Sequence, residues 1–194
     1  MEYITYYDSP IGNITIASDG VKITGLWFDS QKPDDSVLTK NYVEGDIRVF
    51  DRAKEWLDIY FSGRDPGSMP PLKVNATPFR QRVCEIMLTI PYGETITYGE
   101  IAKKLADEKG IEKMSAQAVG SAVGHNPISI MIPCHRVIGA NKTIGGYTGG
   151  IDIKVELLKL EGSYEQVVSK KLDLVRSNMD NHICCGNKFC RKHI

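Results

Sequence analysis

The most specific stretch of this sequence is Ile130-Met131-Ile132-Pro133-Cys134-His135-Arg136-Val137-Ile138-Gly139. A cysteine stands beside a histidine, and apolar residues flank the pair on both sides. Cysteine attacks as the thiolate, and a free thiol with a pKa of about 8.5 is only slightly ionised at neutral pH. A histidine that accepts the thiol proton, itself oriented by a carboxylate, would correct this. From the dipeptide alone, a buried structural cysteine with a chance histidine neighbour is an equally good interpretation.

The residues before this stretch predict three helices. Thr77-Pro78 is typical of a helix start, because a capping hydroxyl precedes a proline at the first helical position. Thr97-Tyr98-Gly99-Glu100 matches a capping box for a second helix. Ser115 is the expected cap of a third, which runs through Val123. The last two helices predict a helix-turn-helix, a pattern that many helix pairs resemble by chance.

The third helix is rich in small residues, namely Ala116, Ala118, Gly120, Ser121 and Ala122. A glycine inside a helix costs roughly 1 kcal/mol of stability, so Gly120 needs a reason. One explanation is close packing against another helix. The other is close approach of the helix backbone to a groove of duplex DNA. The sequence leaves both open.

The N-terminal part predicts strands and one helix. Residues 3–7, 13–18 and 21–28 are rich in β-branched and aromatic residues, and turn residues separate them. An apolar stripe at helical spacing follows, and Ser62-Gly63 ends it. Its members are Val49, Phe50, Ala53, Trp56, Leu57, Tyr60 and Phe61. Residues 64–76, rich in proline and glycine, indicate a linker.

These patterns predict domains at 1–76 and 77–162, followed by a C-terminal segment at 163–194. That segment should begin with a further helix, with apolar positions at Tyr164, Val167, Val168, Leu172 and Val175.

Charge and composition limit the classes of partner. The formal net charge is zero, but residues 1–76 carry an excess of −4, residues 77–162 of +1 and residues 163–194 of +3. This distribution allows a weak, salt-dependent affinity for DNA and argues against tight binding of a polyanion. No apolar run approaches the roughly 20 residues that span a bilayer, and the N-terminus lacks a charged, apolar leader. We therefore expect a cytoplasmic protein (nuclear in a eukaryote) whose five cysteines lie in a reducing compartment.

Pro133-Cys134-His135-Arg136-Val137 resembles the signature of the O6-alkylguanine-DNA alkyltransferases, also called methylated-DNA–protein-cysteine methyltransferases. Asn126-Pro127 before it, and Gly146-Tyr147-Thr148-Gly149-Gly150 and Leu160-Glu161-Gly162 after it, follow the family's order and spacing. The resemblance is strong over residues 77–162, where Pro91-Tyr92-Gly93-Glu94 and Thr97-Tyr98 also match. Residues 1–76 resemble only the family's variable N-terminal domain.

The resemblance implies an α+β fold. The N-terminal domain would be a ribonuclease-H-like antiparallel sheet with a helix. The C-terminal domain would be mostly helical, with a helix-turn-helix that binds double-stranded DNA in the minor groove.

The resemblance also implies a single-turnover DNA repair protein. It would take an alkyl group from O6-alkylguanine onto Cys134, after the base has been flipped out of the duplex. Whether O4-alkylthymine is also accepted, and which alkyl groups fit, is left open. No cofactor is implied, since the thiolate displaces guanine and the resulting thioether consumes the protein. The expected partner is double-stranded DNA that contains alkylated bases. The protein is expected to bind it as a monomer, and no association with a membrane is expected.

Within this resemblance, Cys134 is the nucleophile and His135 deprotonates it through a bridging water. Glu161 holds the imidazole in the required tautomer, and Asn126 fixes the turn that carries the cysteine. Tyr98 donates to the leaving base and presses on the phosphate that rotates during flipping.

Tyr147 and Thr148 form the pocket wall and hydrogen-bond near the guanine oxygen. Ser115, Ala118 and Arg136 complete the expected DNA-binding set.

One position departs from the family pattern. The family usually places an arginine before the alanine in the Ala-Val-Gly run of the third helix, where it fills the space of the extruded base. Here that residue is Gln117. Glutamine can hydrogen-bond to an orphaned base but lacks the planar cation that stacks. We expect weaker flipping on fully paired duplex with intact chemistry.

The sequence indicates no metal site. Residues 1–83 contain no Cys and no His, which excludes the zinc that some relatives carry in their N-terminal domain. The tail holds His182, Cys184, Cys185, Cys190 and His193. Their spacing matches no zinc pattern, so a flexible, oxidisable tail is favoured.

Two other functions compete. A damage sensor with the same fold would bind DNA without chemistry, but non-reactive relatives replace the cysteine. A cysteine hydrolase would use Cys134 and His135, but adjacent residues rarely present both side chains to one atom, and no oxyanion-hole motif stands out.

Overall fold

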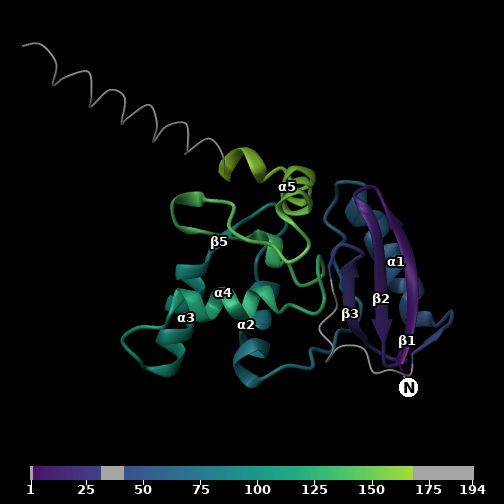
Figure 1. The fold of residues 1–194 in the computed structure, drawn as a ribbon, viewed down its shortest axis with the longest axis horizontal. Helices are drawn as coiled ribbons and strands as arrows, with labels where there is room; N and C mark the ends of the chain where they lie inside the picture. Colours follow the sequence, from purple (N-terminus) through teal and green to yellow (C-terminus); the bar gives the residue numbers. More distant parts are fainter. Residues whose placement is uncertain (1, 32–41, 168–194) are drawn as a thin grey trace, which may run out of the picture.

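The N-terminal part is a four-stranded sheet with a helix against one face (Figure 1). A computed structural model describes residues 2–31 and 42–167. The strands are β1 (Glu2–Ser9), β2 (Gly12–Ser18), β3 (Ile23–Phe28) and β4 (Tyr42–Glu44), in the order β3-β2-β1-β4. The first three form the predicted antiparallel sheet, which confirms the expected fold class. Strand β4 was not predicted, and it pairs parallel to β1.

Strand β3 begins two residues later than predicted because a turn occupies residues 19–22. The Asp19 carboxylate accepts from the backbone N–H groups of Val21 and Lys22, and Ser18 Oγ donates to the Lys22 carbonyl. These local bonds compete with strand pairing, as short polar side chains often do.

Helix α1 (Arg48–Phe61) confirms the predicted apolar stripe. Its buried residues are Val49, Phe50, Ala53, Trp56, Leu57 and Tyr60, which cover one face of the sheet. The expected end at Ser62-Gly63 is also confirmed, since Ser62 is the C-cap and Gly63 has φ 78°.

The C-terminal part is mostly helical, as predicted. Its helices are α2 (Pro78–Leu88), α3 (Tyr98–Lys109), α4 (Ala116–Gly124) and α5 (Ile151–Leu160). A short parallel pair, β5 (Ile96–Thr97) and β6 (Val137–Ile138), and two single turns, η1 (Cys134–Arg136) and η2 (Ala140–Lys142), complete it.

The predicted caps begin three of these helices, α2, α3 and α4. Thr77 Oγ1 accepts from the Arg80 N–H, and Thr97 with Glu100 forms the reciprocal capping box that opens α3. Ser115 Oγ accepts from the Ala118 N–H at the start of α4. Each side chain satisfies a backbone N–H that has no partner within its own helix.

The outer edge of β3 joins the two parts of the chain. The predicted linker reaches this edge, where Ile23 N–H donates to Pro71 O and Lys73 N–H donates to Ile23 O, both at 2.8 Å. Three residues further on, Leu26 N–H donates to Pro127 O at 2.9 Å, and the Leu26 carbonyl accepts from Ser129 N–H at 2.8 Å. The segment that leads to Cys134 is therefore hydrogen-bonded to the N-terminal sheet.

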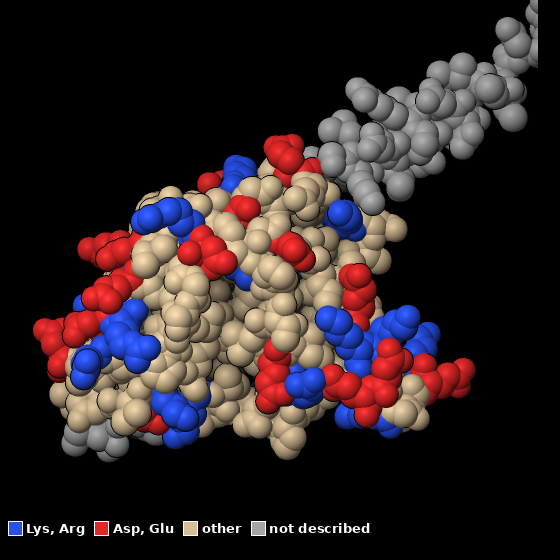
Figure 2. Space-filling view, turned by 180° about the vertical axis from the view of Figure 1, so that it is seen from behind, with Lys and Arg blue, Asp and Glu red and all other residues tan. Residues whose placement is uncertain are grey.

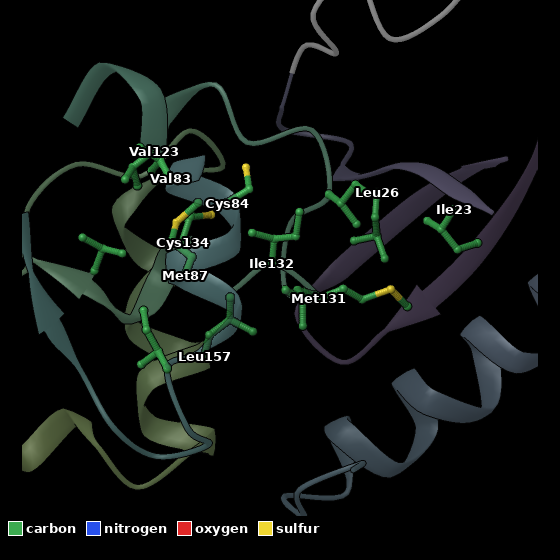
Figure 3. Packing of buried hydrophobic residues seen from close by; sticks show 14 of the residues in the cluster. Ile23, Leu26, Val83, Cys84, Met87, Val123, Met131, Ile132, Cys134 and Leu157 are labelled. Atoms are coloured by element: carbon green, nitrogen blue, oxygen red, sulfur yellow. The ribbon is translucent and has the colours of Figure 1, made fainter. Parts of the chain in front are cut away.

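One hydrophobic cluster spans both parts. Figure 3 shows Met131 and Ile132 between Ile23 and Leu26 of the sheet and the side chains around Met87 and Leu157. The division at residues 76 and 77 stays a prediction.

Residues 164–167 are helical, which agrees with the start of the expected C-terminal helix. The rest of that helix, and the tail residues His182, Cys184, Cys185, Cys190 and His193, lie outside the described residues. Within residues 2–31 and 42–167, no helix is long and apolar enough to span a membrane.

Candidate active site

Cys134 lies at the wall of a cavity of about 440 Å³ in the C-terminal part. This volume is within the range of small-molecule sites. The cavity is lined by Tyr98, Gly120, Val123, Gly124, Cys134, Gly146, Tyr147 and Thr148. Four residues that the sequence predicted for one site, Tyr98, Cys134, Tyr147 and Thr148, thus meet around one space.

The side chain of Asn126 closes the turn that carries Cys134. Its Nδ2 donates to the Ile132 carbonyl at 2.8 Å, to the Ile128 carbonyl at 3.2 Å and to Cys134 Sγ at 3.1 Å. Its Oδ1 accepts from the Ile128 N–H at 3.1 Å. Inside this turn Ile130 has φ 65°, an unusual value for a buried β-branched residue.

Cys134 is only 6% exposed. Burial raises its pKa, while the Asn126 hydrogen bond and the positive charge of Lys154 lower it in part. Burial prevails, because a thiolate loses more hydration than these two groups return. The sulfur therefore needs a base to become nucleophilic.

His135 and Glu161 form a buried pair. His135 Nε2 lies 2.8 Å from Glu161 Oε1, and both side chains are wholly buried. Burial lowers the pKa of His135, although Glu161 opposes that effect. Burial would raise the pKa of Glu161, but His135 and Arg136 lower it to about 2.

This geometry fixes the histidine tautomer. An ionised carboxylate only accepts hydrogen bonds, so Nε2 carries the proton and Nδ1 is the basic nitrogen. His135 Nδ1 is buried and has no hydrogen-bond partner among the described groups. It is the imidazole atom available to take a proton.

Arg136 requires a correction. The sequence placed it among the DNA-binding residues, but it is 8% exposed. Its guanidinium donates to both oxygens of Glu161 at 2.9 Å and to the Ile90 carbonyl at 2.7 Å, and it lies over the Tyr92 ring. Because its donors point into the protein, Arg136 holds Glu161 in place, and these contacts do not support the predicted role in DNA binding.

Tyr60, on α1, was missed as a site residue. Its hydroxyl donates to Glu161 Oε1 at 2.7 Å and lies 3.4 Å from His135 Nε2. In the sequence it is only one position of an apolar stripe, and 101 residues separate it from Glu161. The one available signal was that a buried tyrosine hydroxyl usually has a polar partner.

Lys154, on α5, was also missed. Its side chain is fully buried, and Nζ donates to Val137 O at 2.6 Å and to Gly146 O at 3.3 Å. It links the strand after Cys134 to the loop that carries Tyr147. Burial lowers the pKa of Lys154 to about 8.

The pocket wall formed by Tyr147 and Thr148 is tied to its surroundings. Thr148 Oγ1 donates to the Gly124 carbonyl at the end of α4, at 2.8 Å. Ser30 Oγ, from the N-terminal part, donates to Gly149 O at 3.0 Å. Burial and the neighbouring Cys134 raise the pKa of Tyr147 well above 10, so its hydroxyl stays protonated.

The exposed face of helix α4, beside the cavity, carries mainly small side chains. Val119, Ala122 and Val123 are buried, so helix packing explains Ala122. It does not explain the exposed small residues Ala116, Ala118 and Ser121. Gln117 and the capping Ser115 are also exposed on this helix end, and Gly120 lines the cavity.

On the face of the molecule that is turned away in Figure 1, positive and negative side chains are not separated into different regions. Figure 2 shows acidic and basic side chains side by side over the described residues of that face. Among residues 2–31 and 42–167, no group of three or more His, Cys, Asp or Glu side chains is placed to hold a metal ion.

Comparison with known proteins gives a consistent result over residues 3–73 and 78–163. Residues 78–163 match the DNA-binding domain of 6-O-methylguanine DNA methyltransferase, and residues 3–73 match its ribonuclease-like domain. A methylated-DNA–protein-cysteine methyltransferase of Haemophilus influenzae is 40% identical over 160 residues, which is 82% of this chain and 86% of the relative. The Mycobacterium tuberculosis protein of that name is 44% identical over 156 residues, 80% of this chain and 90% of the relative.

A solved structure of Mycobacterium tuberculosis OGT in complex with DNA is similar in fold, with a TM-score of 0.71. It is 42% identical in sequence, and the match covers 84% of this chain and 94% of that one.

Proposed function

Because this chain belongs to the 6-O-methylguanine DNA methyltransferase family, we propose that it repairs alkylated DNA by direct reversal. It moves an alkyl group from O6 of guanine to Cys134 Sγ. The observation that carries this assignment is the cavity that brings Cys134 together with Tyr98, Tyr147 and Thr148 beside the exposed face of α4.

Proton transfer comes first. The Cys134 thiol proton passes to His135 Nδ1 through one water molecule, and Glu161 stabilises the imidazolium through its 2.8 Å contact with Nε2. The Asn126 amide, 3.1 Å from the sulfur, and the charge of Lys154 stabilise the thiolate.

Alkyl transfer is then a single displacement. The sulfur forms a bond to the alkyl carbon as the bond between that carbon and guanine O6 breaks. The electron pair stays on the base, which accepts a hydrogen bond from the Tyr98 hydroxyl and takes up one proton from water. His135 returns the thiol proton to water, so the proton balance closes and Tyr98 stays protonated. The products are unmodified guanine in DNA and a thioether on Cys134. Because no group in the site hydrolyses a thioether, each protein molecule acts once and needs no cofactor.

DNA binding uses the helix-turn-helix formed by α3 and α4. The relative from Mycobacterium tuberculosis has been solved in complex with DNA. In this chain, Ser115, Gln117 and Ala118 lie on the exposed end of α4. Small side chains there let the backbone approach the minor groove, and the target base is flipped into the cavity.

The protein acts as a monomer on double-stranded DNA, since one chain supplies every residue of the site. Residues 1–76 and 77–162 are its two domains, and residues 163–194 form the C-terminal segment. It works where the cell keeps its DNA, in the cytoplasm of a prokaryote or the nucleus of a eukaryote.

The test is incubation with an oligonucleotide duplex that contains O6-methylguanine, followed by mass spectrometry of the digested protein. We expect the peptide with Cys134 to gain the mass of one CH2 group, at most once per molecule. The peptide with Cys84, the other free cysteine among the described residues, is the internal control and stays unmodified.

Other results would overturn the proposal. Binding without a mass change would indicate a damage sensor. If the protein neither binds the DNA nor gains mass, the hydrolase interpretation would remain. Repair by a Cys134→Ser variant, or many lesions cleared per molecule, would also be incompatible with transfer to Cys134.

A further inference from the structure

Glu161 Oε1 receives three donors, and one of them comes from the N-terminal part. His135 Nε2, Arg136 Nη2 and the Tyr60 hydroxyl lie 2.8, 2.9 and 2.7 Å from this oxygen. Among the described residues, Tyr60 is the only N-terminal side chain with a hydrogen bond to this cluster. The shortest of the three contacts is thus made by the part of the chain that lacks the nucleophile.

The ring of Tyr60 is held firmly. It is fully buried, and it stacks on Trp56 with centroids 5.5 Å apart and an interplanar angle of 7°. The rings of Tyr92 and His135 meet it edge to face. The hydroxyl therefore cannot turn away from Glu161 without disturbing the core between the two parts.

We propose that Tyr60 is a positioning residue that controls the proton affinity of His135 through the shared oxygen of Glu161. This inference rests on the proposed function, because it assigns a role within the same proton relay. It also gives the N-terminal domain a part in the chemistry.

The physical argument concerns how strongly Glu161 attracts the imidazole proton. A carboxylate oxygen that already accepts two other hydrogen bonds has less negative charge to offer His135. Removal of the Tyr60 hydroxyl returns that charge to the contact with Nε2 and favours the imidazolium. The pKa of His135 then rises, and less of the protein has a neutral base at neutral pH.

The other ionisable groups near the imidazole remain in place in this comparison. Arg136 on η1, Lys154 on α5 and Glu161 after α5 act on His135 itself, and Cys134 is its neighbour in the chain. Tyr92 before β5 and Tyr147 in the pocket loop lie near Tyr60. A shift of the pH midpoint in the Tyr60→Phe variant is therefore caused by the loss of one hydroxyl group.

The test compares wild type with Tyr60→Phe in the full-length chain. The first-order rate of methyl transfer at saturating DNA is measured from pH 5 to 9, and so is the rate of Cys134 alkylation by iodoacetamide without DNA. We expect the midpoint of the acidic limb to move to higher pH in both profiles. Transfer near neutral pH should slow by about tenfold, a part of what general-base catalysis contributes, and should recover toward wild type at high pH.

Tyr7→Phe is the matched control. The Tyr7 hydroxyl also donates to a carboxylate, that of Asp58 on α1, at 2.8 Å, and neither residue lines the cavity. Its removal should leave both profiles unchanged. Replacement of Tyr60 by 3-fluorotyrosine keeps the ring and strengthens the donor, so the midpoint should move to lower pH. This second variant serves if Tyr60→Phe folds poorly.

These experiments distinguish the failure of the Tyr60 inference from the failure of the proposed function. If the wild type transfers methyl groups and both Tyr60 variants keep its midpoint, with at most a uniform loss of rate, Tyr60 is merely structural and the inference is wrong. If the wild type accepts no methyl group, the proposed function fails. The iodoacetamide profile would then still decide whether Tyr60 tunes the Cys134–His135 pair.

Discussion

Asn126 and Cys134 are eight residues apart in the chain, and the amide nitrogen of one lies 3.1 Å from the sulfur of the other. The same amide group holds two carbonyls of the intervening turn. One side chain therefore both shapes the turn and stabilises the thiolate that it presents.

Asn126→Ala should damage both properties. Loss of the three bonds to the Ile128 and Ile132 backbone should lower the free energy of unfolding by about 3 kcal/mol, since each such bond contributes about 1 kcal/mol. Loss of the donor to Sγ should raise the pKa of Cys134 and slow its reaction with iodoacetamide. Urea unfolding and thiol kinetics measure the two effects. Asn75→Ala, at an exposed position, is the control. An unchanged thiol rate would show that Asn126 does not act on the sulfur.

Gln117→Arg should speed repair of fully paired duplex. Arginine can stack in the space of the flipped base and adds a charge near phosphate, whereas glutamine can do only part of this. The gain should vanish on an oligonucleotide in which the lesion is single-stranded. Val21→Arg, in an exposed turn of the sheet, adds the same charge away from α4. An equal or lower rate for Gln117→Arg on duplex DNA would refute the prediction.

Glu161→Gln should make the free energy of unfolding less dependent on pH in the acidic range. The pKa of Glu161 is about 2, below its ordinary 4.5, so the folded protein binds fewer protons than the unfolded chain between these values. The stability that this carboxylate contributes is complete above pH 4.5, on the order of 3 kcal/mol, and is lost as the pH falls toward 2. The variant should be less stable at pH 7, because it leaves Arg136 unpaired.

Urea unfolding at several pH values checks this. The stability gap between wild type and Glu161→Gln should narrow below pH 4.5. A gap that stays constant down to pH 3 would mean that the Glu161 pKa is not lowered in the folded protein.

Lys154→Met should raise the pKa of Cys134. It removes a buried positive charge that favours the thiolate, and it leaves the carbonyls of Val137 and Gly146 without their donor. Reaction of Cys134 with iodoacetamide at neutral pH should slow several-fold. Lys159→Met, on the exposed side of the same helix in a pair with Glu156, should not change it. Equal rates for both variants would rule out an electrostatic role for Lys154.

Local signals explain why much of this fold could be predicted. Thr77, Thr97 and Ser115 begin helices through bonds to residues three positions away, and such contacts can be read from the sequence. The site residues Cys134, His135, Asn126 and Glu161 were recognised from family spacing. The structure places Asn126 against Cys134 and Glu161 against His135, and their individual roles stay predictions.

The errors and omissions have one physical origin, which is contact between distant segments. Arg136 was placed in the DNA-binding set because the sequence does not show that Glu161 and the Ile90 carbonyl accept its hydrogen bonds. Tyr60 and Lys154 were missed for the same reason. Residues 64–76 were predicted only as a linker, and residues 71–73 bind the edge of β3 through backbone groups, which leave no side-chain pattern.

Residues 71–73 and 127–129 cover the edge of β3 with backbone hydrogen bonds, and this affects how the protein unfolds. A fragment that starts at Thr77 would lose the backbone partners of Pro127 and Ser129 and expose the apolar cluster around Met131. A fragment that stops at residue 76 would leave an unpaired strand open to self-association. Heating should therefore melt both halves in a single cooperative step, and neither should persist alone as an independent unit.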